Sequence, residues 1–144
     1  LMGHSKGGNL AAYAGMFCDP EIQKRIERVY PLDSPGFIGN TLESEEYGRI
    51  QSRVHKVIPK GSLIGMLLEN HGAYSVVESN QMGIMQHDPF SWQVTDGAFH
   101  TLEEISSGAK YMNQTLNSWI TGMSIDERIR LSRCTLRPFD RRQY

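Results

Sequence analysis

Apolar positions along the chain alternate between a helical spacing and short uninterrupted runs. Residues 9–17 are rich in alanine, and Leu10, Ala14 and Phe17 fall on one face of a predicted helix. Three apolar runs of strand length follow downstream, at residues 29–32, 54–59 and 74–79. The charged segment between the first two runs, residues 41–53, is predicted to be helical. This alternation favours an α/β fold, a mostly parallel sheet flanked by helices with right-handed crossovers.

End signals mark three further helices. Asp19-Pro20-Glu21 combines an N-cap residue, a proline at the first helical position and an acid in the first turn, which predicts a short helix to about residue 28. A longer periodic pattern starts at Thr101, and its apolar positions recur every three or four residues: Leu102, Ile105, Ala109, Met112, Leu116, Trp119 and Met123. Thr101 with Glu104 forms a capping box at its start.

A second capping box, Ser124 with Glu127, predicts a last helix in a tail over residues 124–144. This tail carries an excess of arginine, which we interpret as a solvated helical surface. The chain shows no internal repeat and no linker, so its 144 residues are read as one domain.

Composition excludes several functional classes. Fifteen basic residues against sixteen acidic ones give a net charge of -1, which argues against nucleic acid or an anionic membrane as a partner. No apolar run approaches the ~20 residues that span a bilayer. Cys18 and Cys134 are far apart and outside any metal-binding spacing, so reduced thiols and a cytoplasmic location are expected, with no metal or cofactor.

The pattern that carries chemistry stands at the start of the chain. Gly3-His4-Ser5-Lys6-Gly7 has the form Gly-x-Ser-x-Gly, in which the serine sits on a strained turn between a strand and a helix. We expect Gly3 and Gly7 to give this turn room and Gly8 to let the helix approach the sheet. The phosphate-binding loop is excluded, because the segment lacks its spacing and its Lys-Ser/Thr pair.

The nine residues from Gly3 to Ala11 resemble the nucleophile elbow of lipase-like α/β-hydrolases, with Lys6 in place of the usual apolar residue. Residues 29–37 and Gln86-His87-Asp88 extend the resemblance, which covers roughly the first two thirds of the chain and is closest to a bacterial lipase-like family of unknown function. It implies the C-terminal part of an α/β-hydrolase fold and a catalytic triad in the chain order serine, acid, histidine. Ser5 would be the nucleophile, and the Lys6 N–H would donate to the oxyanion.

His87 is the preferred general base. It follows the strand at 74–79, whereas His71 precedes that strand, and active-site loops of parallel sheets leave the carboxyl ends of strands. His71 stays open as a second candidate. His55, inside a predicted strand, and His100, beside the predicted long helix, are expected to have structural roles.

Asp33 is the preferred acid, because it closes the strand at 29–32. In most α/β-hydrolases the acid follows the next strand, but residues 57–62 hold no carboxylate; some lipases of the superfamily place it one strand earlier, which matches Asp33. The alternative is a turn aspartate bonded to its own backbone. Asp88 adjoins His87 and could hardly orient the far side of its ring.

These residues predict a serine hydrolase that cleaves carboxylic esters of small acyl substrates through an acyl-enzyme. A catalytically silent relative that serves as a binding module stays open, as does a thioesterase or peptidase on the same triad. Apolar residues near the proposed site could line an acyl pocket, although the core is their preferred place: Phe37, Ile38, Leu63, Ile64, Met66, Leu67, Met82, Ile84, Met85 and Phe90.

Only Leu1 and Met2 precede the motif, so we expect residues 1–144 to form a partial domain that lacks its first strands and second oxyanion donor. The isolated chain is then expected to be inactive. Its open sheet edge is expected to pair with the upstream segment or with a second copy.

Overall fold

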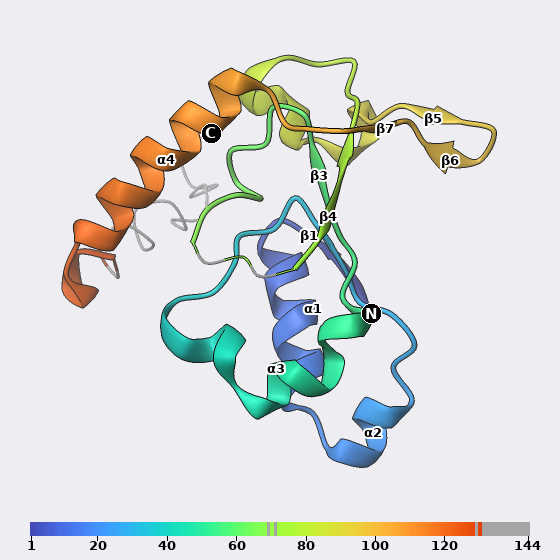
Figure 1. Cartoon of the computed structure of the whole chain (residues 1–144), viewed down its shortest axis with the longest axis vertical. Helices are drawn as coiled ribbons and strands as arrows, with labels where there is room; N and C mark the ends of the chain where they lie inside the picture. The colour runs from blue at the N-terminus through green and yellow to red at the C-terminus, as the bar shows by residue number, and fades with distance from the viewer. Residues whose placement is uncertain (69, 71, 129, 131–144) are drawn as a thin grey trace, which may run out of the picture.

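A computed structural model describes residues 1–68, 70, 72–128 and 130 of the chain (Figure 1). Its centre is a five-stranded sheet in the order β1-β2-β3-β4-β7. The strands are Met2–His4 (β1), Tyr30–Leu32 (β2), Lys56–Pro59 (β3), Tyr74–Val77 (β4) and Thr101–Leu102 (β7). The first four run parallel and β7 runs antiparallel to β4, which confirms the predicted α/β class and its mostly parallel sheet.

The three predicted strands form where their apolar runs lie, because each can bury alternate side chains on the two faces of the sheet. Leu32 pairs with Val57, and Val57 pairs with Ser75. The parallel register brings the carboxyl ends of β1 and β2 to one edge, directly before Ser5 and Asp33. In Figure 1 this edge lies in the upper half of the molecule, as do η3 (Gly83–His87) and η4 (Pro89–Ser91).

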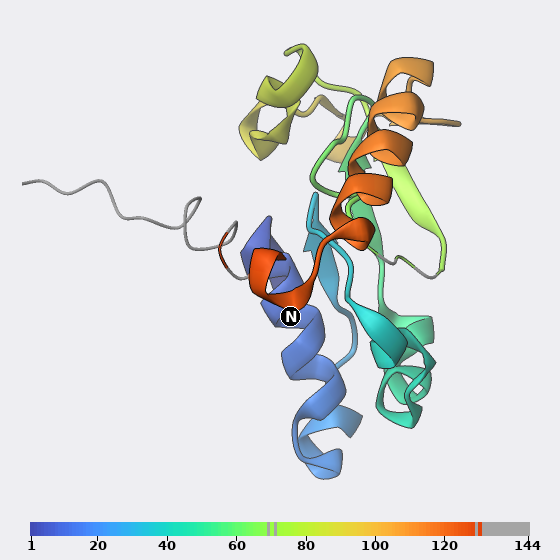
Figure 2. The same ribbon diagram turned by 90° about the vertical axis from the view of Figure 1, so that its left-hand side faces the viewer.

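Helices cover the sheet on the face that Val29 and Ile58 share. The bounds are Lys6–Phe17 (α1), Pro20–Lys24 (α2), Gly39–Glu43 (η1), Glu45–Ile50 (α3), Gln51–Arg53 (η2) and Ser107–Gly122 (α4). Met16 of α1 and Ile50 of α3 belong to one buried cluster with Val29, and Ala109 of α4 packs in a second cluster with Ile58. Figure 2 shows α4 above and α1 with α3 below.

Two helix predictions were right in place but wrong in detail. The predicted apolar face of α1 points outward, with Leu10 55% and Phe17 45% exposed, while the opposite face buries Ala12 and Met16. Small residues let that buried face lie close to the strands, so spacing alone selected the wrong side. The segment 41–53 is not one helix but three short pieces, η1, α3 and η2.

The helix predicted from Thr101 starts later. Thr101 and Leu102 pair with Val77 and Val76 as β7, so their backbone is extended and the capping box with Glu104 does not form. Ser106 caps α4 instead, accepting a hydrogen bond from the Ala109 N–H. The helix predicted to about residue 28 ends at Lys24, although Asp19 caps it as expected. A two-stranded hairpin, Val94–Thr95 (β5) and Ala98–Phe99 (β6), precedes β7.

The second capping box is confirmed, because Ser124 and Glu127 bond reciprocally through their backbone N–H groups and side chains. Most of the tail predicted over 124–144 lies outside the described residues, as do Cys134 and His71. Within the described part, no helix is long and apolar enough to cross a membrane. There, β1 pairs only with β2, so the sheet edge beside it is open.

Candidate active site

Ser5 occupies a strained turn where β1 passes into α1. Its backbone angles are φ = 55° and ψ = -129°, a region that residues with a Cβ seldom adopt. The Ser5 N–H donates to the Leu32 carbonyl at 2.9 Å, which ties the turn to the last residue of β2. A serine held in a strained conformation between a strand and a helix has the geometry that the sequence pattern predicts.

The glycines around Ser5 that have no room for a side chain are Gly3 and Gly8, and not Gly3 and Gly7 as predicted. A Cβ on Gly3 would lie 2.2 Å from the Gly7 carbonyl oxygen, and one on Gly8 would lie 2.7 Å from both the Gly3 oxygen and the Ser34 Cβ. A Cβ on Gly7 would meet nothing within 4 Å. Gly3 and Gly8 therefore let strand and helix approach, and the expectation that Gly7 gives side-chain room was wrong.

Lys6 is the first residue of α1. Backbone N–H groups in the first turn of a helix have no acceptor within the helix, and the helix dipole favours negative charge there. The Lys6 N–H therefore has the character of an oxyanion donor, while its side chain is exposed.

Asp33 follows β2 and is 1% exposed. One carboxylate oxygen, Oδ2, lies 2.7 Å from Nδ1 of His87. The other, Oδ1, accepts hydrogen bonds from the Ser62 hydroxyl at 2.5 Å and from the Gly65 N–H at 3.0 Å. The alternative of a turn aspartate bonded to its own backbone does not fit, because these partners lie 29 or more residues away.

His87 ends η3 and reaches Asp33 from the other side of the site. A carboxylate only accepts, so the 2.7 Å contact means that Nδ1 of His87 carries the proton and that Nε2 is a free base in the neutral ring. Gln86 fixes this turn: its side chain accepts from the Gly61 N–H, and its carbonyl accepts from the Trp92 indole.

The described residues show no hydrogen bond between the Ser5 hydroxyl and the His87 ring. The two segments meet through His4 instead, whose Nε2 donates to the His87 carbonyl at 2.7 Å. The two imidazole rings also lie against each other, with their centroids 4.4 Å apart. From the sequence, His4 was placed only inside the Gly-x-Ser-x-Gly pattern, and no spacing in the sequence signals its contact with His87.

Three further residues were missed. Ser62 is 1% exposed and supports Asp33, and Gly65 has no room for a side chain because a Cβ would lie 2.4 Å from the Asp33 carboxylate. The buried Asn113 of α4 donates to the Ser62 carbonyl at 2.9 Å. No spacing in the sequence signals these contacts, which depend on how the loop after β3 folds back.

The remaining candidates make their contacts elsewhere. The His55 ring is paired with Arg28 at 2.7 Å, and His100 is paired with Glu78 at 2.9 Å. His100 lies between β6 and β7, not beside a helix. Asp88 caps η4 by accepting from the Phe90 N–H, which agrees with its exclusion as the acid.

The apolar residues expected mainly in the core are partly at the surface. Phe37 and Met66 pack against buried clusters, as predicted. By contrast, Met82, Ile84, Met85 and Phe90, on the segment that carries His87, are all more than half exposed, and Phe90 is 96% exposed. This segment presents an apolar surface close to the histidine.

The fold and these contacts define an α/β protein with a mostly parallel sheet, in which Asp33 and His87 are joined beside the strained Ser5. A family model described as Mbeg1-like matches residues 1–134, and the chain belongs to the Mbeg1-like family. No curated protein and no solved structure gives a significant match.

Proposed function

We propose that the protein is a serine hydrolase of the α/β-hydrolase type that cleaves carboxylic esters. The observation that carries the proposal is the bond of 2.7 Å between the buried Asp33 and the partly exposed His87, next to a serine in a strained strand-to-helix turn. A histidine that is oriented by a buried carboxylate beside a serine is the arrangement that activates a hydroxyl nucleophile.

In the proposed reaction the Ser5 oxygen attacks the ester carbonyl while Nε2 of His87 accepts the hydroxyl proton. Asp33 keeps Nδ1 protonated and stabilises the imidazolium that forms. The tetrahedral oxyanion accepts a hydrogen bond from the Lys6 N–H, and its collapse expels the alcohol, which takes the proton from His87. Water then gives a proton to His87 and attacks the acyl-serine, releasing the carboxylic acid and free Ser5.

The contact between Ser5 and His87 is expected to form when substrate is bound, since catalytic hydrogen bonds are often open in unliganded sites. The exposed apolar side chains beside His87, including Met85 and Phe90, favour a substrate with an apolar acyl or alcohol part. The preference for esters over thioesters or peptides rests on the resemblance to lipases.

The test is labelling with a fluorophosphonate, which reacts only with an activated serine. We expect one adduct on the full-length protein, mapped to the peptide that contains Ser5, and none in its Ser5→Ala or His87→Ala variants. Ser107→Ala, which removes an exposed hydroxyl at the start of α4, serves as the control and should be labelled like the unmodified protein.

Hydrolysis of p-nitrophenyl butyrate should follow the labelling across the same variants, with the matching thioester and anilide as comparisons. A folded protein that neither labels nor hydrolyses any of the three would overturn the proposal and favour a binding module.

A further inference from the structure

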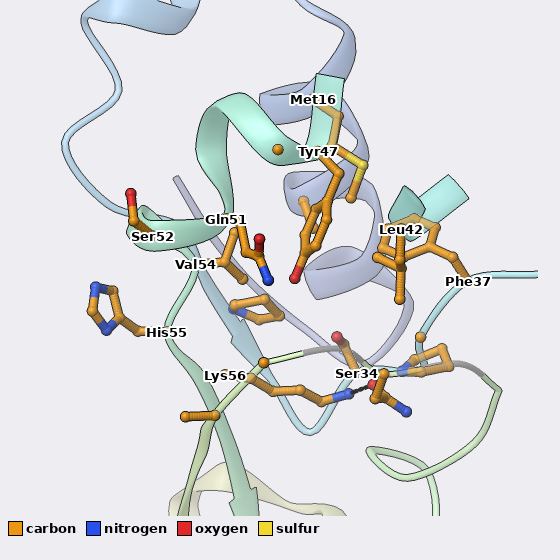
Figure 3. A pocket seen from close by; sticks show the side chains of 18 residues that line it. Met16, Ser34, Phe37, Leu42, Tyr47, Gln51, Ser52, Val54, His55 and Lys56 are labelled. Atoms are coloured by element: carbon orange, nitrogen blue, oxygen red, sulfur yellow. Dashed lines mark hydrogen bonds between the residues drawn. The ribbon is translucent and has the colours of Figure 1, made fainter. Parts of the chain in front are cut away.

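A cavity apart from Ser5, Asp33 and His87 has no role in the proposed reaction. It encloses about 510 Å³ between α1, α3 and the start of β3 (Figure 3). None of Ser5, Asp33 and His87 lines it. Its volume is in the range of cavities that bind small molecules.

The walls of this cavity combine apolar and polar side chains, and the apolar ones come from several elements. Met16 comes from α1, Leu42 from η1, Val54 from the segment before β3 and Phe37 from the segment between β2 and η1. Figure 3 shows Met16 and Tyr47 pointing into the space from above. This apolar part of the lining suits an alkyl or aryl group.

Lys56 supplies the charge of the cavity. Its side chain crosses the floor, and its ammonium donates to the Asn70 side-chain oxygen, beside Ser34 (Figure 3). No Asp or Glu occurs among the described residues that line the cavity. An ammonium ion has three N–H donors, so this one can serve an anion in the cavity as well as Asn70.

Burial lowers the pKa of Lys56 to about 8, and the charge of the nearby Asp33 partly opposes this shift. Among the described residues, no ion pair joins Lys56 to a carboxylate. A desolvated cation is costly, and an anionic ligand would relieve that cost. The lining contains no arginine, and a single lysine matches a monoanion better than the multiple charges of a phosphate.

We propose that this cavity binds an amphiphilic monocarboxylate, with its carboxylate on the Lys56 ammonium and its apolar chain along Met16, Phe37 and Leu42. The proposal does not depend on the hydrolase activity, because none of Ser5, Asp33 and His87 lines the cavity.

Isothermal titration with octanoate tests the proposal, and the Ser5→Ala protein is used so that hydrolysis plays no part. We expect saturable one-to-one binding, at least about tenfold tighter than that of 1-octanol, which has the same chain without the charge. Octyl phosphate is the comparison that distinguishes a general anion site, and it should bind more weakly than octanoate.

Two lysine variants locate the site. Lys56→Met keeps the length of the side chain and should weaken octanoate binding at least about tenfold while leaving octanol binding unchanged. Lys60→Met, at an exposed position just after β3, should bind octanoate like the parent protein. Equal octanoate affinity in Lys56→Met, octanol binding as tight as that of octanoate, or no octanoate binding would each overturn the proposal.

A measurement on the protein with Lys56 intact covers the case in which Lys56→Met fails to fold. The ¹³Cε resonance of Lys56 should report a higher pKa in saturating octanoate than without it. Among the described residues, Asp33 at the end of β2 is the charged group that acts on the ammonium, and the other titratable side chains of the lining are Tyr47 on α3 and His55 before β3. An unchanged pKa would contradict a carboxylate beside Lys56.

Discussion

Asp33 holds three hydrogen-bond donors with its two carboxylate oxygens, at a backbone angle of φ = 39° that is itself strained. A strained residue with several hydrogen-bond partners is held in its conformation by the surrounding structure. Its orientation of His87 thus depends on Ser62 and Gly65 as well as on its own charge.

Replacing Asp33 with asparagine should reduce ester turnover by about three to four orders of magnitude with little change in KM. The amide can present an N–H to His87, which would place the ring proton on Nε2 and remove the base. Asp88→Asn, one residue beyond the histidine, is the control, since Asp88 only caps η4. Steady-state kinetics with p-nitrophenyl butyrate measures turnover, and a thermal melt of each variant checks that it is folded. Turnover of Asp33→Asn within threefold of the parent would contradict the role of Asp33.

His4 is expected to position His87 through its donor bond to the His87 carbonyl and through ring contact. Loss of such a bond costs roughly 0.5–1.5 kcal/mol, so His4→Ala should lower kcat about threefold to tenfold while KM stays the same. His4→Gln, which keeps an N–H donor, should recover part of the loss. His100→Ala provides a matched removal of an exposed ring. If His4→Gln and His4→Ala were equally impaired, the donor bond would have no such role.

Among the elements, the turn between β1 and α1 has no room for a side chain at Gly3. Gly3→Ala would drive a Cβ into the Gly7 carbonyl group, and backbone on both sides cannot rotate away as a side chain could. We expect a loss of about 1–3 kcal/mol in the free energy of unfolding. Gly7→Ala meets no atom and should change that free energy by less than about 1 kcal/mol. Urea unfolding followed by circular dichroism compares the two variants. A Gly7→Ala protein as destabilised as Gly3→Ala would contradict the different steric roles of the two glycines.

The strands could be predicted because each is a compact apolar run between turn formers, as at 29–32 before Asp33. The start of α4 could not. Thr101 and Glu104 satisfy the local rule for a capping box, but the open edge of β4 offers backbone partners to Thr101, and a tertiary contact of this kind leaves no trace in local spacing. The backbone becomes helical only after Ser106, the N-cap residue of α4.

In the candidate site, the acid and the histidine could be predicted, but the residues that support them could not. Asp33 and His87 were found because each follows a strand, and the parallel sheet brings such positions to one edge. Ser62 and Asn113 are 51 residues apart and meet only because α4 packs over the loop after β3. Pairing over that distance depends on the whole fold, so no motif reveals it.

At the scale of the whole molecule, the buried Asp33 and the half-buried Lys56 lie on the same face of the sheet. Asp33 has three partners, whereas Lys56 faces a cavity, and the negative charge of Asp33 is one of the influences on the pKa of Lys56. Burial of Lys56 is thus a cost to the fold that its ligand can offset. The protein without ligand should show this cost in the pH dependence of its stability.

The pKa of Lys56 is about 8 in the folded protein and 10.5 in a model peptide, so between these values the unfolded chain binds more protons. Stability then rises with pH from about 8 towards 10.5, because the unfavourable charge is lost from the folded state first. Below pH 8 both states are protonated and the full cost remains.

Lys56→Met should therefore be more stable than the parent at pH 7, and the difference should shrink steadily as pH is raised to 9.5. Tyr47, whose pKa is raised by burial, acts in the opposite direction only at and above pH 10, outside this range. Urea unfolding of the two proteins and of Lys60→Met at half-unit steps of pH measures the difference, and stability curves that stay parallel from pH 7 to 9.5 would show that Lys56 is not held in a desolvated state.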